Sequence, residues 1–242
     1  MRLPEVIGHR GAAGRAPENT LAGIRRAAAL GVSWVEFDVK LTADGRCVLF
    51  HDETLDRTTD GSGRVAVMPY DAIRRLDAGG WFAAEFAGEP VPRLDAALAL
   101  VVELGLQANI EIKPCPGRET ETADKVVAEA LACWPAARQP PLISSFTPEC
   151  LAVARTIAPD WPRGLLCLKL PRNWRTQLAA LDCCMLGYLH RRLNRRIVSR
   201  ITAAGVAVTA FTVNDPAQAT VLYGWGVTTI VSDVPDDLLA AP

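Results

Sequence analysis

Short runs rich in Val, Ile and Leu alternate with helix-like runs along almost the whole chain. They predict principal strands at 3–8, 34–39, 108–113, 142–145, 164–168, 185–189, 206–212 and 229–232, with an extra strand at 46–51. Helices are predicted between them at 18–30, 94–104, 120–133, 148–157, 194–204 and 216–223. Strands that alternate with helices are typical of βαβ units and a parallel sheet. Eight principal strands close a barrel, so we predict an α/β fold in which residues 1–242 form a single (β/α)8 TIM-type barrel.

One segment, approximately residues 53–92, interrupts this alternation after the second strand. It is rich in glycine, with Asp60-Gly61-Ser62-Gly63 and Gly79-Gly80, and it carries only short helical pieces. A connection of this length inside a compact domain is usually functional. We expect an insertion that either caps the strand ends or covers an edge of the barrel.

Composition excludes several classes of partner. The 242 residues are 50% hydrophobic and carry a net charge of −1, which provides no broad basic field for nucleic acid. No apolar run is long enough to cross a bilayer or to act as a signal peptide. The seven cysteines lack paired metal-ligand spacing and are interpreted as reduced thiols. We therefore expect a cytoplasmic protein that acts on a small molecule, without nucleic acid or membrane insertion; the oligomeric state is not predicted.

A basic cluster at 191–196 is the exception to the balanced charge. If a helix begins at Asn194, then Arg192, Arg195 and Arg196 share one face of it. We interpret this face as solvated rather than as an anion site.

Four short polar motifs lie on or just after strand-like runs. They are His9-Arg10-Gly11, Glu36-Phe37-Asp38, His51-Asp52 and Glu111-Ile112-Lys113. Side chains alternate between the faces of a strand, so the polar residues of each strand motif point one way and the apolar residues the other. In a β/α barrel the carboxyl ends of the strands build the active site, and we expect the four motifs to meet there.

Glu36, Asp38 and Glu111 predict a metal site, because hard divalent cations prefer oxygen ligands. A single inward carboxylate can instead pair with Lys or Arg in a barrel core. Three carboxylates buried without an ion would repel one another, which favours the metal.

The other polar residues predict phosphate chemistry beside that metal. His9 and His51 are candidates for general acid and base, since imidazole titrates near neutral pH. Arg10 and Lys113 are candidates for phosphate contacts, or else ion-pair partners of the carboxylates. For the third histidine, His190, a structural role is at least as good an interpretation as a catalytic one. The pocket is predicted to include Phe211 and, near other strand ends, Ser144, Ser145, Asn214 and Asp233.

The ordered set of motifs resembles the glycerophosphodiester phosphodiesterases over nearly the full length. Each motif alone is weak, but their order and spacing together are specific. The motifs are Gly8-His9-Arg10-Gly11, Pro17-Glu18-Asn19-Thr20, Glu36-Phe37-Asp38-Val39, His51-Asp52, Leu55-Asp56-Arg57-Thr58-Thr59, Asn109-Ile110-Glu111-Ile112-Lys113, Ser144-Ser145-Phe146, Thr212-Val213-Asn214-Asp215 and Ser232-Asp233-Val234-Pro235-Asp236.

The resemblance implies a β/α barrel with an insertion after the second strand and one divalent cation, Mg²⁺ or Ca²⁺. It implies that Glu36, Asp38 and Glu111 are the metal ligands. It also implies His9 and His51 as acid and base, and Arg10 and Lys113 as the phosphate contacts. This sequence has Phe211 where the family usually carries Trp. It also reads Gly226-Val227-Thr228-Thr229 where Gly-Val-Asp-Gly is usual.

The expected reaction is hydrolysis of a glycerophosphodiester to glycerol 3-phosphate and an alcohol. Two alternatives stay open: a phospholipase C or D type of phosphodiesterase acting on intact lipid, and a non-catalytic module that binds phosphodiesters. The sequence assigns neither acid nor base between the two histidines. Direct attack by water and a cyclic phosphate intermediate are both compatible with it.

Overall fold

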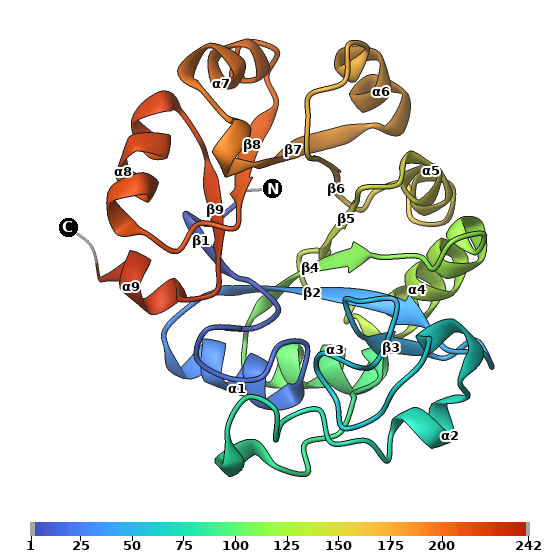
Figure 1. The fold of residues 1–242 in the computed structure, drawn as a ribbon. Helices are drawn as coiled ribbons and strands as arrows, with labels where there is room; N and C mark the ends of the chain where they lie inside the picture. Colours follow the sequence, from blue (N-terminus) through green and yellow to red (C-terminus); the bar gives the residue numbers. More distant parts are fainter. Residues whose placement is uncertain (1–2, 241–242) are drawn as a thin grey trace.

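A closed ring of eight parallel strands forms the centre of the molecule, in a computed structural model that describes residues 3–240 (Figure 1). Strand β1 pairs with both β2 and β9, which closes the ring and confirms the predicted TIM-type barrel. In ring order the strands are β1 (Val6–Gly8), β2 (Trp34–Leu41), β4 (Gln107–Ile112), β5 (Leu142–Ser145), β6 (Arg163–Cys167), β7 (Cys183–Leu189), β8 (Ala207–Phe211) and β9 (Thr229–Ser232).

Helices surround the ring in the described part of the chain. They are α1 (Leu21–Ala29), α3 (Leu94–Glu103), α4 (Glu119–Cys133), α5 (Pro148–Ile157), α6 (Trp174–Leu181), α7 (Arg195–Thr202), α8 (Pro216–Trp225) and α9 (Pro235–Leu239). The main apolar core lies between helices and strands, where Val35, Phe37 and Val39 are fully buried. None of the helices within residues 3–240 combines the length and the apolar character needed to cross a membrane.

Two helices and one shared face differ from the sequence prediction. Helices α6 and α9 were not predicted; they are short, with eight and five residues. The Asn194 side chain accepts a hydrogen bond from the Ile197 amide at 3.0 Å, and helix α7 therefore begins only at Arg195. Arg192 lies before it in the 3-10 helix η3 (His190–Arg192), so the predicted face shared with Arg195 and Arg196 is wrong.

The insertion after β2 begins with the predicted extra strand. Strand β3 (Cys47–Leu49) runs antiparallel to β2, outside the ring. The chain then forms η1 (Val65–Val67), α2 (Tyr70–Ile73) and η2 (Ala84–Phe86) around an apolar cluster of its own. Figure 1 shows this segment beside α1 and α3, and the Ala22 amide of α1 donates a hydrogen bond to Glu89 at 3.0 Å. The insertion thus packs mainly against the side of the barrel.

Candidate active site

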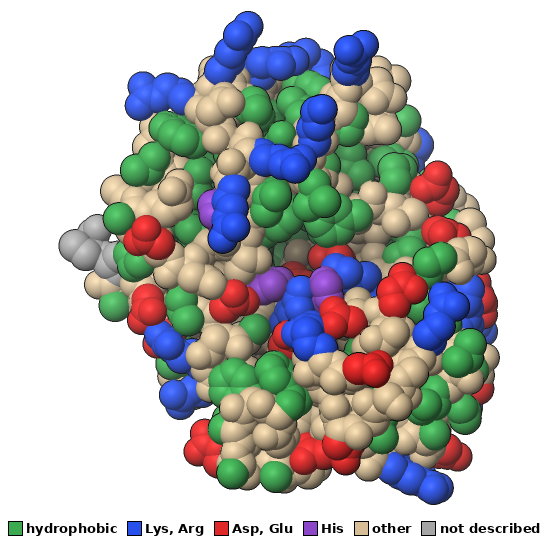
Figure 2. Space-filling view, in the orientation of Figure 1, with side chains coloured by type: hydrophobic (Ala, Val, Ile, Leu, Met, Phe, Trp, Pro, Cys, Tyr) green, Lys and Arg blue, Asp and Glu red, His purple; other side chains and the backbone are tan. Residues whose placement is uncertain are grey.

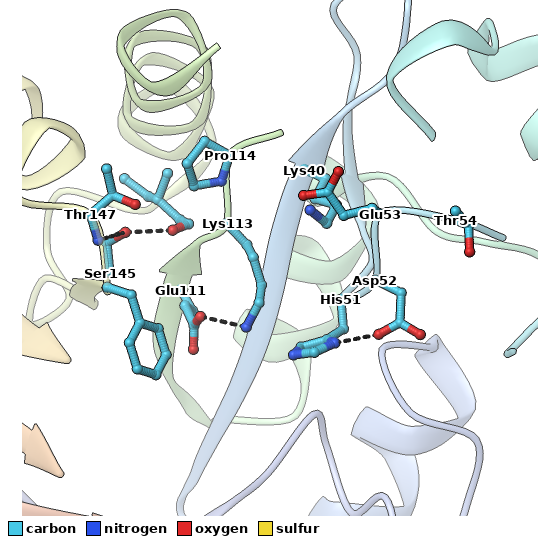
Figure 3. Close-up of a pocket in the computed structure, with 12 residues that line it drawn as sticks. Lys40, His51, Asp52, Glu53, Thr54, Glu111, Lys113, Pro114, Ser145 and Thr147 are labelled. Atoms are coloured by element: carbon cyan, nitrogen blue, oxygen red, sulfur yellow. Dashed lines mark hydrogen bonds and ion pairs between the residues drawn. The ribbon is translucent and has the colours of Figure 1, made fainter. Parts of the chain in front are cut away.

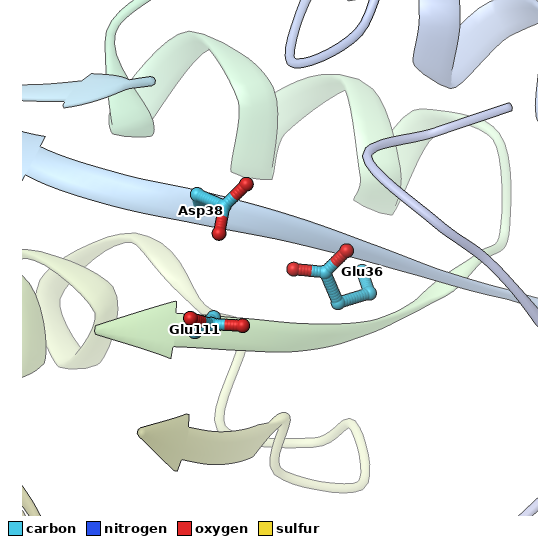
Figure 4. A group of neighbouring side chains, drawn as sticks. All are labelled: Glu36, Asp38 and Glu111. Carbon is cyan, nitrogen blue, oxygen red and sulfur yellow. The ribbon is translucent and has the colours of Figure 1, made fainter. Parts of the chain in front are cut away.

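The three predicted carboxylates lie together inside the barrel. Glu36 and Asp38 point inward from β2, and Asp38 is in register with Glu111 of β4. One oxygen from each residue lies within 4.8 Å of the others, and all three residues are buried (Figure 4). The alternation of side chains along β2 and β4 therefore produces the cluster that the sequence predicted.

Burial and mutual repulsion dominate the electrostatics of this cluster. Burial, with Asp38 and Glu111 close by, raises the pKa of Glu36 well above its usual range. Burial and Asp38 likewise raise the pKa of Glu111 to about 7. Burial opposes ionisation of Asp38 too, yet Lys113 and Arg10 hold its pKa below the usual value. Glu36 Oε1 is buried and has no hydrogen-bond partner, so the cluster presents an unused oxygen ligand.

Two cations contact the cluster, and both are residues that the sequence singled out. Lys113 Nζ lies 2.8 Å from Glu111 Oε1 and 3.1 Å from Asp38 Oδ1. Arg10 Nε lies 3.2 Å from Asp38 Oδ2, and its Nη1 lies 2.6 Å from Glu18. Arg10 and Lys113 are ion-pair partners of the carboxylates in this structure, as one of the two alternatives expected.

The loop after β1 holds Arg10 and His9 through tight backbone contacts. A Cβ on Gly8 would lie 2.0 Å from the Gly11 carbonyl oxygen, so only glycine fits. Gly11 has φ +89° and donates its amide to the Glu36 carbonyl at 3.0 Å. The Arg10 amide donates to the Glu36 carboxylate at 2.9 Å. The two glycines of the first motif therefore fix the loop against β2.

Each of the two site histidines is oriented by a carboxylate. His9 Nδ1 donates to Asp233 at 2.6 Å, and His51 Nδ1 donates to Asp52 at 2.5 Å. His9 Nε2 is 3.9 Å from Glu36, beside the cluster. Burial, together with Arg10 and Lys113, lowers the pKa of His51 although Asp38 opposes this. Both rings thus leave Nε2 free for the cavity.

Three further residues, Glu18, Asn19 and Arg57, support the charged groups of the site, and the sequence alone gave them no role. Arg57 donates to Asp52 at 2.6 Å and to Glu18 at 2.7 Å, and Glu18 also binds Arg10. Asn19 donates to Asp38 at 2.9 Å and accepts from its amide at 3.1 Å. These residues belong to the family motifs of the sequence. Their partners lie far away in the sequence, so no local pattern could identify the pairs.

The charged groups line a cavity of two lobes. The closed lobe, about 220 Å³, lies within the barrel and includes His9, Arg10 and Glu36. The open lobe, about 560 Å³, lies over the ends of β2, β4 and β5 and reaches Glu53 and Thr54 at the start of the insertion (Figure 3). Both lobes share four residues, which mark their junction: His51, Glu111, Lys113 and Phe146.

An apolar wall faces the charged groups across the closed lobe. It consists of Phe146, Leu166, Leu168, Met185, Phe211 and Val231. Phe211 lies edge-on to Phe146, with ring centroids 5.6 Å apart. Figure 2 shows histidine, cationic and acidic side chains gathered at the hollow of this face, with a hydrophobic area beside them.

The remaining predicted pocket residues divide into lining and supporting positions. Ser145 lines the open lobe, whereas Asp233 contacts His9 and is itself bound by Asn214 at 2.7 Å. Ser144 is buried without a partner for its hydroxyl group. His190 lies in η3, 3.3 Å from the Phe211 carbonyl oxygen, and lines neither lobe.

Comparison with known proteins gives a consistent result. Residues 9–237 match the model of the glycerophosphoryl diester phosphodiesterase family. A glycerophosphodiester phosphodiesterase of Caldanaerobacter subterraneus subsp. tengcongensis is 34% identical over 97% of this chain and 96% of its own length. One of Bacillus subtilis is 31% identical over 96% of this chain and 84% of its own length. A phosphodiesterase of Oleispira antarctica, solved with the product sn-glycerol-3-phosphate, has a TM-score of 0.96 and 40% identity, covering 99% of this chain and 96% of its own.

Proposed function

The chain belongs to the glycerophosphoryl diester phosphodiesterase family, and we propose that it hydrolyses glycerophosphodiesters to glycerol 3-phosphate and an alcohol. The observation that carries this proposal is the meeting of a buried cluster of three carboxylates with two oriented imidazoles and two cations at the closed lobe. The Oleispira antarctica relative, with its bound product, supports glycerol 3-phosphate as the retained half of the substrate.

Glu36, Asp38 and Glu111 are the proposed ligands of one divalent cation, Mg²⁺ or Ca²⁺. The donor set fits a hard cation, because it is all oxygen and includes the unpartnered Glu36 Oε1. A bound cation would neutralise the mutual repulsion of the carboxylates and stabilise negative charge on the phosphate. Carboxylates engaged by the cation would interact less with Arg10 and Lys113, leaving both side chains available to hold phosphate oxygens.

His9 and His51 are the proposed acid and base, acting through Nε2. One ring would take the proton of the attacking hydroxyl or water as the new P–O bond forms. The other would donate a proton to the alcohol oxygen as the old P–O bond breaks. Asp233 and Asp52 would hold the rings in the correct tautomer and stabilise them when protonated. Attack by water and attack by a glycerol hydroxyl both fit this arrangement.

One observation favours a second candidate substrate, a phospholipid. Leu168 is 53% exposed at the edge of the closed lobe. Lys169, Arg172, Arg191 and Arg192 are exposed in the same or the neighbouring loop. An apolar and basic rim of this kind would suit the surface of an anionic bilayer.

An assay with glycerophosphocholine tests the proposal. We expect the purified protein with added Mg²⁺ or Ca²⁺ to release glycerol 3-phosphate and choline in equal amounts. The double variant His9→Ala/His51→Ala, prepared in the same way, controls for a contaminating enzyme. Vesicles of phosphatidylcholine that also contain an anionic phospholipid form the second arm. Hydrolysis only of the vesicles would favour the second candidate, and hydrolysis of neither would overturn the proposed activity.

A further inference from the structure

The open lobe is lined by Lys40, a lysine that pairs with no acidic side chain among residues 3–240. Lys40 follows Glu36 and Asp38 on the inward face of β2, two residues further along the strand. It is 1% exposed and lines the open lobe. Within residues 3–240 its ammonium group forms no hydrogen bond and no ion pair with an acidic side chain within 4.0 Å.

Lys40 lies just beyond the point where the pairing between β2 and β4 ends. The pairing of β2 with β4 ends at Val39, and Lys40 pairs only with Val48 of β3. Its side chain therefore lies beyond the carboxylate cluster, above the last ring pairing. Figure 3 shows Lys40 in the same part of the lobe as Glu53. Glu53 is exposed and its nearest cation is Arg64, at 3.8 Å.

An ammonium group that lines an open lobe and has no acidic partner is available to an anionic ligand. Lys113, in the same lobe, is instead engaged by two carboxylates. For Lys40 the missing negative charge would come from a ligand that enters the open lobe.

The two lobes indicate which part of a diester would reach Lys40. Lys113, His51 and Glu111 border both lobes, so a phosphate held there would place one substituent in each. The closed lobe, with its apolar wall, suits a substituent of fixed size such as glycerol. The open lobe suits an alcohol that varies between substrates.

We propose that Lys40 binds an anionic group, a carboxylate or a phosphate, carried by the leaving alcohol. This inference rests on the proposed hydrolysis of glycerophosphodiesters. Lys40 would act on specificity and would take no part in breaking the P–O bond. An ion pair formed in the lobe would favour anionic leaving alcohols by about tenfold or more.

Two matched substrate pairs test the proposal. Glycerophosphoserine differs from glycerophosphoethanolamine only by a carboxylate, and glycerophosphoglycerol phosphate differs from glycerophosphoglycerol only by a phosphate. The ratio of kcat/KM within each pair is compared between the wild type and Lys40→Met. We expect Lys40→Met to lower at least one ratio about tenfold, and the affected pair identifies the carboxylate or the phosphate as the ligand.

Two further variants complete the experiment. Lys40→Arg should retain most of the affected ratio, because it keeps the charge. Lys125→Met removes an exposed lysine of α4 and should leave both ratios unchanged. Unchanged ratios in Lys40→Met, with normal hydrolysis of glycerophosphoethanolamine, would overturn the role of Lys40. Absence of hydrolysis of every diester by the wild type would instead overturn the proposed function.

Discussion

The two halves of the barrel contribute different chemistry to the same cavity. Strands β1, β2 and β4, with the segments that follow β1 and β3, supply His9, Arg10, the carboxylates, His51 and Lys113. Strands β6 to β9 supply Leu166, Met185, Phe211 and Val231 to the wall of the closed lobe, together with Thr209 and Thr212. Asp233, which follows β9, lies behind His9 and binds its Nδ1. The first half can bind charge and move protons. The second half mainly excludes water and sets the shape of the closed lobe, and it orients His9 through Asp233.

The two halves should therefore tolerate amino-acid substitutions differently. Most charged groups of the first half have fixed partners, as when Arg57 joins Asp52 to Glu18, so one substitution disturbs several contacts. The apolar wall depends on size and contact area, which neighbouring side chains partly restore after a substitution. Changes in the charged half should therefore affect turnover, and changes in the apolar half should mainly affect KM.

Removal of the divalent cation should have the largest effect. We expect hydrolysis of glycerophosphocholine to disappear after chelation and to return with Mg²⁺ or Ca²⁺, because the cation would carry the phosphate charge. Glu111→Gln should be similarly inactive, whereas Glu103→Gln at the end of α3 should be normal. Full turnover in protein shown by metal analysis to contain no metal would refute the metal assignment.

Loss of one site histidine should have the next largest effect. His9→Ala and His51→Ala should each reduce kcat by about a hundredfold or more while the circular dichroism spectrum stays unchanged. His190→Ala is the matched control, since His190 lies outside both lobes. A near-normal rate in His9→Ala or His51→Ala would remove that residue from the proposed mechanism.

The charged half should also make the metal-free protein sensitive to pH. Burial and Asp38 raise the pKa of Glu111 to about 7 in the folded state, above its usual value of 4.5. Between these values the folded state binds more protons than the unfolded state, so stability falls as pH rises, by about 3 kcal/mol at most.

Urea unfolding of metal-free wild type and Glu111→Gln between pH 4.5 and 7.5 measures this effect. The difference between the two proteins cancels groups common to both, such as His51. We expect the free energy of unfolding of the wild type to fall relative to Glu111→Gln across this range, and less so with excess cation. A constant difference would show that Glu111 is already ionised at low pH.

Truncation of the apolar wall should have the smallest effect. Phe211→Ala removes the contact with Phe146, and we expect it to raise KM for glycerophosphocholine about fivefold while kcat changes less than threefold. Phe86→Ala truncates a comparable edge-on pair with Phe82 in the insertion and should leave both constants unchanged. A fall in kcat as large as that of the histidine variants would break the distinction between the two halves.

The sequence predicted the charged half better than the apolar half. The period of two along β2 and β4 determines which side chains face inward, and this identified Glu36, Asp38 and Glu111. Leu166, Leu168 and Met185 were not predicted as pocket residues, because an apolar residue on or next to a barrel strand is equally compatible with a place in the core. Lys40 shares the period of Glu36 and Asp38, but only the structure shows that β4 ends before it and leaves it without a partner.

A crystal structure with Mn²⁺ and glycerol 3-phosphate tests the division of the cavity most directly, because Mn²⁺ takes the same oxygen ligands as Mg²⁺ and scatters anomalously. We predict one anomalous peak between Glu36, Asp38 and Glu111, with the phosphate next to Lys113 and the glycerol carbons against Leu166 and Phe211. A peak away from the three carboxylates, or glycerol bound in the open lobe, would contradict the account.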